Sequence, residues 1–102
     1  MGEWVRLCGR EELPSESEAK EFCVRGHTLC VATLNGKPLA LDNVCPHRGG
    51  PLAEGVIEHG KIVCPWHQWE FDLATGQATQ SAAVKAMTYP LRQQGDDLLV
   101  EI

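Results

Sequence analysis

Two short segments of the chain each combine a cysteine, a proline and a histidine. Residues 45–47 read C-P-H and residues 64–67 read C-P-W-H, so the pattern is C-x-H, sixteen residues, and C-x-x-H. Thiolate and imidazole are the soft and borderline ligands that iron, zinc and copper prefer, and four such groups are enough for one metal site. The spacing therefore predicts a metal centre held by four side chains: Cys45, His47, Cys64 and His67.

Each pair of candidate ligands lies on a segment that favours a tight turn. Ligands one or two positions apart on a turn can point at a common centre, and the proline between them removes an amide donor and stiffens the backbone. Gly49 and Gly50 follow the first pair and permit a positive φ and a close approach of backbone N–H groups to a sulfur-rich centre. Such amides would stabilise negative charge on sulfur.

The elements that must position these two turns are predicted to be short strands. Apolar pairs at 56–57 and 62–63 flank a His59-Gly60 turn, a hairpin that would return the second turn beside the first. Asn35-Gly36 between two apolar runs is a strong hairpin signal. Because four ligands from two turns must meet, this local geometry makes the pairing of the turns plausible.

The rest of the chain also favours strands. Helical periodicity is weak, and the ten glycines and six prolines are spaced as in a small sandwich or barrel. The sequence therefore predicts an all-β fold, a small antiparallel β-sandwich or barrel. Further strand-favouring runs lie at 22–24, 28–34, 38–41, 69–71, 87–91 and 98–102, with turns at 74–76 and 95–96, and an acidic segment at 11–21 reads as a solvated loop.

Composition limits the class of protein. With 102 residues and 43% hydrophobic residues, the chain has the size of one domain, which we assign to residues 1–102. Its 9 basic and 14 acidic residues give a net charge of −5, which argues against nucleic acid as a partner. The apolar runs are too short for a membrane span and the N-terminus does not resemble a signal peptide. We expect a soluble, cytoplasmic protein with no membrane partner.

The remaining cysteines and aromatic residues are expected to be structural. Five cysteines form an odd set without dense spacing, which favours a reducing compartment over a disulfide framework. Trp66, between two candidate ligands, fits the core and an exposed docking face equally well. Small buried hydrophobes are expected at Cys8, Cys23 and Cys30, turn residues at His27 and His59, and packed aromatic rings at Trp4, Phe22, Trp69, Phe71 and Tyr89.

The ligand pattern, with the flanking sequences C-P-H-R-G-G-P and C-P-W-H, resembles that of Rieske iron–sulfur proteins. The resemblance is specific over residues 43–76, which it identifies as the cluster-binding part, formed by two ligand loops. In that family two thiolates hold one iron of a [2Fe–2S] cluster and two imidazoles hold the other. It implies one such cluster, with Cys45 and Cys64 on the inner iron and His47 and His67 on the outer iron.

The chain departs from the respiratory members that it otherwise resembles. Gly50 and Trp66 stand where those proteins carry an extra cysteine in each loop, and Trp69 and Phe71 stand where they carry hydroxyls. Without a disulfide or hydroxyl donors, a midpoint potential at the low end of the family range of roughly −150 to +300 mV is expected. Residues 77–84 lack the proline-rich cover of many members, which leaves the shape of that segment open.

The resemblance implies an electron carrier with no catalytic residues of its own. The leading hypothesis is a Rieske-type ferredoxin that passes one electron from a flavin reductase to an oxygenase such as an aromatic-ring dioxygenase. It would dock through Pro46, His47, Arg48, Trp66 and His67. The alternative is the small subunit of an assimilatory NAD(P)H nitrite reductase, bound to its large subunit. A structural zinc domain is a third reading, because Cys and His also form closed zinc sites.

Overall fold

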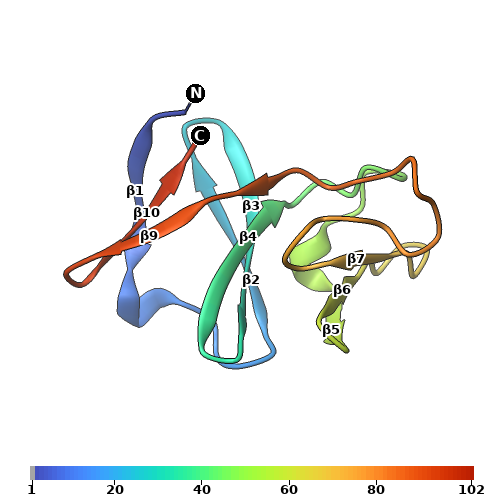
Figure 1. The fold of residues 1–102 in the computed structure, drawn as a ribbon, viewed down its shortest axis with the longest axis horizontal. Helices are drawn as coiled ribbons and strands as arrows, with labels where there is room; N and C mark the ends of the chain where they lie inside the picture. The colour runs from blue at the N-terminus through green and yellow to red at the C-terminus, as the bar shows by residue number, and fades with distance from the viewer. Residues whose placement is uncertain (1) are drawn as a thin grey trace.

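The computed structural model describes residues 2–102, whose strands form three antiparallel sheets (Figure 1). The first sheet has the order β1 (Trp4–Gly9), β10 (Asp97–Glu101), β9 (Leu91–Gln94). The second has the order β2 (Ala19–Val24), β3 (His27–Leu34), β4 (Lys37–Asp42), β8 (Thr88–Tyr89). The third is β5 (Val56–Glu58), β6 (Lys61–Val63), β7 (Glu70–Asp72). The all-β prediction is confirmed.

The three sheets form a larger and a smaller part. The first two sheets make up the base, residues 2–42 and 88–102, and the third sheet belongs to the loop lobe, residues 43–87. Figure 1 shows the chain leaving the base at the end of β4, building the loop lobe to one side and returning through a long connection to β8. Both candidate ligand turns therefore lie in the smaller part of the molecule.

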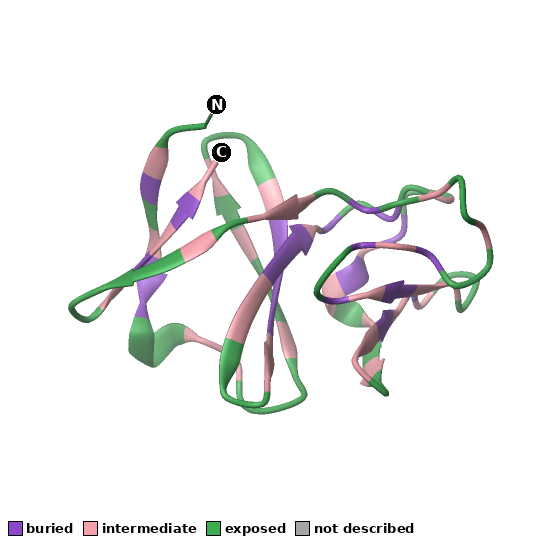
Figure 2. Cartoon of the chain, viewed as in Figure 1, coloured by how far each residue is buried: buried purple, intermediate pink, exposed green. Residues whose placement is uncertain are grey.

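Strand β3 supplies the core of both parts. Successive side chains on a strand point to opposite faces, and here Leu29 and Val31 join the core of the base, whereas Cys30 and Ala32 join the core beneath the loop lobe. All four are 0% exposed, and Figure 2 shows the buried stretch of this strand. The central strand therefore contributes to the cores of both the loop lobe and the base.

The hairpins expected at Asn35-Gly36 and His59-Gly60 are confirmed. Asn35 has φ 56° and Gly36 has φ 75°, and His59 and Gly60 have φ 53° and 78°. Positive φ at both central residues is the conformation of a type I′ turn, whose twist matches that of the flanking strands. These dipeptides therefore set the β3–β4 and β5–β6 registers from local sequence alone.

Three details of the base differ from the expectations. Strand β1 was not anticipated, because a register shift between Arg6 and Cys8 breaks its alternation and leaves Val5 and Cys8 both buried. The run expected over 87–91 is divided into β8 and β9, since Pro90 between them has no N–H to donate to a ladder. The segment expected as a solvated loop contains the 3₁₀ helix η1 (Arg10–Glu12) and the beginning of β2.

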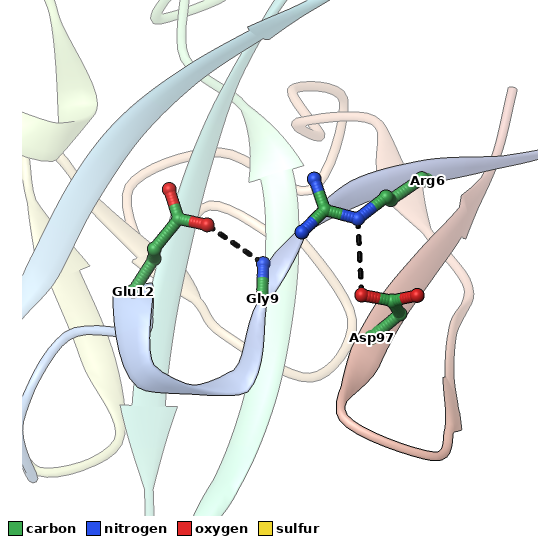
Figure 3. A network of polar contacts seen from close by, with 4 residues as sticks. All are labelled: Arg6, Gly9, Glu12 and Asp97. Atoms are coloured by element: carbon green, nitrogen blue, oxygen red, sulfur yellow. Dashed lines mark hydrogen bonds and ion pairs between the residues drawn. The ribbon is translucent and has the colours of Figure 1, made fainter.

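Polar contacts close the first sheet at its end (Figure 3). Arg6 pairs with Asp97 across β1 and β10 at 3.0 Å, and the Gly9 N–H donates to the Glu12 carboxylate at 2.8 Å. The side chains of the ion pair are 57% and 50% exposed, so the pair contributes little to stability. These contacts fix local geometry far from the loop lobe.

One of the three structural cysteines was placed wrongly. Cys8 and Cys30 are buried, as expected, but Cys23 is exposed. Strand β2 lies at the edge of its sheet, and its two faces are at most half-buried, so an apolar neighbourhood in the sequence does not bury this thiol. No helix in residues 2–102 is both long and apolar enough to cross a bilayer.

Candidate metal centre

The two candidate ligand turns have the same backbone. In loop one, residues 45–50, the Cys45 N–H donates to the Gly50 carbonyl at 2.8 Å and the Gly49 N–H donates to the Cys45 carbonyl at 2.7 Å. In loop two, residues 64–69, the equivalent bonds join Cys64 to Trp69 at 2.8 Å and Gln68 to Cys64 at 3.0 Å. Each cysteine thus begins a closed turn that carries its histidine.

The fourth position after each cysteine adopts a left-handed backbone. Gly49 has φ 83° and Gln68 has φ 55°. Glycine adopts this region without cost, whereas a residue with a Cβ pays roughly 1–2 kcal/mol. The Gln68 side-chain amide also donates to the Pro65 carbonyl at 3.3 Å. Loop two therefore closes with backbone strain that loop one avoids.

The two thiols lie together beneath the loops. Cys45 is 2% exposed and Cys64 is 1% exposed, and the Cys64 thiol is near enough to raise the pKa of Cys45. Burial raises the pKa of Cys45, the N–H groups of His47 and Arg48 that point at its sulfur lower it, and Cys64 raises it again.

The two imidazoles form a second pair nearer the surface. The ring centroids of His47 and His67 lie 5.4 Å apart with an interplanar angle of 89°. His47 is half-buried and His67 is exposed. Loss of solvation, followed by the charges of Arg48 and His67, lowers the pKa of His47 below its usual value. This favours the neutral imidazole, which is the form that binds metal.

The chain thus groups its donors as a buried thiol pair and a more exposed imidazole pair. Within residues 2–102, no set of three or more His, Cys, Asp or Glu side chains converges on a single ion position. Gly50 leaves room beside the thiol pair, because a Cβ there would lie 2.9 Å from the Cys64 sulfur and 2.9 Å from the Trp66 ring. A thiol pair and an imidazole pair fit a group with two metal ions, one bound by the softer sulfur ligands and the other by nitrogen ligands.

A buried asparagine connects loop one to the base. Asn43 is 4% exposed, and its side-chain oxygen accepts from the Ala53 N–H at 2.7 Å while its amide donates to Glu21 at 3.3 Å. Its own N–H donates to the Thr28 carbonyl at 2.9 Å. Two residues before Cys45, Asn43 therefore holds the start of loop one against both β2 and β3.

The segment without proline is held by the side-chain amides of two glutamines. The Gln77 amide nitrogen donates to the carbonyls of Ser81 and Val84 at 3.0 Å each, and the Gln80 side chain accepts from the Glu70 N–H at 3.0 Å. Val84 packs against the core of the loop lobe. These bonds give residues 77–84 a defined path without the rigidity of proline.

The two tryptophans of loop two take different positions. Trp66 is 57% exposed, so it does not lie in the core, and its place on a docking face stays a prediction. Trp69 packs against the core of the loop lobe, as expected, but its ring also stacks on His47, with centroids 3.9 Å apart and an interplanar angle of 10°. Sequence reasoning missed this contact with a candidate ligand, as it missed Asn43 and Gln77, because each depends on segments that meet only in the fold.

Comparison with known proteins gives one family for the chain. The model of the Rieske [2Fe-2S] domain family matches residues 3–92. The ferredoxin component of an alkene monooxygenase system from Xanthobacter autotrophicus is 31% identical over 99 residues, which are 96% of this chain and 80% of that protein. The ferredoxin component of a naphthalene 1,2-dioxygenase system from Pseudomonas aeruginosa is 29% identical over 100 residues, 97% and 95% of the two chains.

Solved structures agree with the architecture. A ferredoxin from Sphingomonas yanoikuyae B1 superimposes with a TM-score of 0.86 at 25% identity, over 98% of this chain and 99% of that one. A protein described as an NADH-dependent nitrite reductase small subunit from Mycobacterium tuberculosis superimposes with a TM-score of 0.87 at 20% identity, over 100% and 96%. At that identity, the second likeness concerns the fold alone.

Proposed function

The chain belongs to the Rieske [2Fe-2S] domain family, and from this premise we propose that it is a ferredoxin that carries single electrons on one [2Fe–2S] cluster. Such a cluster, when bound, accepts and releases one electron. The observation that supports this function is the division of the donors into buried thiols and accessible imidazoles. It leaves the imidazole side of the site open to an electron-transfer partner.

We assign the ligands by this division. Cys45 and Cys64 hold the inner iron, and His47 and His67 hold the outer iron, within a cluster-binding part at residues 43–76. The backbone hydrogen bonds of His47 and Arg48 that lower the pKa of Cys45 favour negative charge on its sulfur, as hydrogen bonds to sulfur do in such sites. With two neutral ligands in place of thiolates, the oxidised site has zero net charge, which makes reduction easier than with four thiolates.

Ligand variants with matched controls test this assignment. We expect His67→Ala and Cys45→Ser to abolish a stoichiometry of two iron and two sulfide per chain. His59→Ala, at an exposed turn, and Cys23→Ser, at an exposed thiol, should retain it. Metal analysis and the EPR spectrum of the dithionite-reduced protein measure both. One zinc per chain and no EPR signal in the wild type would refute the carrier function and support the structural zinc domain.

The docking surface surrounds the imidazole pair. Pro46, Arg48 and His67 are exposed, and the exposed apolar side chains of Val44 and Trp66, at 53% and 57%, lie on the same two segments. Electron-transfer encounters bury little surface, below about 1,200 Å². A small apolar patch with one arginine beside the ligands suits a partner that binds briefly and releases.

The partners follow from the relatives. Two of them are ferredoxin components of a dioxygenase and of a monooxygenase system, so the acceptor is assigned as an oxygenase. The resemblance to the family implies a flavin reductase as the donor. The small subunit of a nitrite reductase is the alternative, supported only by likeness of fold. The free thiols of residues 2–102 are compatible with a reducing compartment, and we place the protein in the cytoplasm.

Mixing experiments separate the two kinds of partner. With a carrier, oxygenase turnover in the presence of reductase should saturate as ferredoxin is added, and size exclusion should show no stable complex. A stable, stoichiometric complex with a large flavin or siroheme protein would instead support the fixed subunit. Trp66→Ala should lower the apparent affinity for the acceptor, whereas Val56→Ala, at a similarly exposed apolar residue on β5, serves as the matched control.

A further inference from the structure

The ring of Trp69 is the aromatic face closest to a candidate ligand. It lies parallel to the His47 imidazole, with 3.9 Å between centroids and 10° between planes. Stacked aromatic rings attract each other beyond the effect of the area that they bury. The His67 imidazole also lies beside the His47 ring, in a T-shaped arrangement with 5.4 Å between centroids and 89° between planes. The His47 ring therefore has one parallel and one nearly perpendicular aromatic neighbour.

Trp69 is itself firmly held. Its carbonyl accepts the Cys64 N–H at 2.8 Å, which closes loop two, and its half-buried side chain packs against the core of the loop lobe. His47 belongs to loop one, so the stack joins the two loops through side chains. Because both the backbone and the side chain of Trp69 are held in place, its ring can act as a fixed plane against which the His47 ring is set.

The His47 ring has a rotational freedom that needs such a plane. Rotation of an imidazole about its Cβ–Cγ bond is broad and only weakly restrained by intrinsic torsional preference. We propose that Trp69 is a positioning residue that sets the plane of the His47 imidazole and so directs its nitrogen toward the outer iron. This inference rests on the ligand assignment proposed above. It assigns Trp69 a role that its expected place in the core does not include.

The neighbouring tryptophan is the natural control. Trp66 lies three residues earlier in the same loop and is 57% exposed. Its ring faces Gly50 in loop one, and the structure of residues 2–102 records the stack on His47 for Trp69 alone of the tryptophans. Substitution at either position therefore removes a similar aromatic surface, but only substitution of Trp69 removes the ring that stacks on His47.

The test compares Trp69→Leu, Trp69→Phe and Trp66→Leu in the cluster-loaded protein. The first keeps apolar volume but removes the flat face, and the second restores a flat face. Two readouts are taken: the EPR g-values and line widths of the reduced protein, and the rate of cluster loss to an iron chelator. Far-UV circular dichroism verifies folding. Should Trp69→Leu fail to fold, Trp69→Met, whose flexible side chain fills irregular gaps, replaces it.

We expect Trp69→Leu or Trp69→Met to broaden the EPR lines and to lose the cluster about tenfold faster, within the range for removal of groups that orient metal ligands. Trp69→Phe should restore most of both properties, and Trp66→Leu should resemble the wild type in these two readouts, neither of which measures docking. Equal effects of the flat and non-flat substitutions, or a wild-type spectrum in all three variants, would overturn the inference. A wild type without a [2Fe–2S] cluster would instead overturn the ligand assignment beneath it.

Discussion

Replacement of Gly50 by alanine is the sharpest available perturbation of the site, because it adds one methyl group between the loops. The new Cβ would lie 2.9 Å from the Cys64 sulfur and 2.9 and 3.0 Å from two atoms of the Trp66 ring. Unstrained contacts are about 3.5–4.0 Å, so the neighbours must retreat by about half an ångström or more. The exposed Trp66 ring can turn away, but Cys64 is 1% exposed and cannot.

The consequence for the site follows from the tolerance of metal–ligand bonds. Such distances hold within about 0.2 Å, which is smaller than the displacement of the sulfur. Gly50→Ala should therefore lower the iron content and increase the rate of cluster loss. Overpacking of this kind also costs about 1–3 kcal/mol of unfolding free energy. Iron and sulfide analysis and denaturant unfolding, followed by circular dichroism, measure the two effects.

Gly49→Ala separates steric from backbone effects. A Cβ at Gly49 meets nothing within 4 Å, but φ is +83°, so this variant pays only the left-handed backbone cost of roughly 1–2 kcal/mol. Gly50 does not have a positive φ, so Gly50→Ala introduces only the steric contact and no backbone strain. We expect Gly49→Ala to retain the cluster and Gly50→Ala to lose it. Full cluster content in Gly50→Ala, or equal loss in both variants, would refute the reasoning.

Four further predictions concern loop two, the segment at residues 77–84 and the buried thiol of Cys30. Gln68→Gly should raise the unfolding free energy by about 0.5–1 kcal/mol. Glycine relieves the left-handed backbone strain of roughly 1–2 kcal/mol, which exceeds its own entropy cost of roughly 0.5–1 kcal/mol. Unchanged or lower stability in a denaturant titration would contradict this prediction. Gln77→Glu removes the amide donor to two backbone carbonyls and places a carboxylate against them, so it should lower the unfolding free energy by about 1–3 kcal/mol. The control Gln93→Glu, on the polar strand β9, should change stability little. Burial raises the pKa of Cys30 from 9.0 to about 12, so iodoacetamide at pH 9 should modify exposed Cys23 readily and Cys30 only after unfolding, as read by peptide mass spectrometry. Because the folded state favours the protonated Cys30 thiol, the stability that this thiol contributes should be present below pH 9 and be lost as pH rises toward 12. If the unfolding free energy of both wild type and Cys30→Ala stays unchanged over that interval, burial of Cys30 is not the cause.

Several features of the protein were readable from sequence because they are local. Positive φ at Asn35-Gly36 and His59-Gly60 follows from the few residues that tolerate it, so both hairpins could be predicted. The identity of the four candidate ligands follows in the same way from residue type and spacing within two turns. The fold class followed from the density of turn signals and the absence of helical periodicity.

Other features depended on which segments meet in space. Cys23 is exposed because β2 is an edge strand, and nothing within the sequence of a strand states its place in a sheet. Strand β1 escaped detection because its register shift removes the alternation that marks a strand. Asn43 and Gln77 bind groups on other segments, so their roles have no signature of their own.

The candidate centre itself divides along the same line. Residue chemistry alone predicted two thiols and two imidazoles as the candidate ligands, since donor type is a property of each side chain. Only the tertiary structure decided that the thiols pair in the core and the imidazoles pair near the surface, and that the Trp69 ring lies flat on His47. Those relations join loop one to loop two across a hairpin and a buried strand, and packing between distant segments is what sets them.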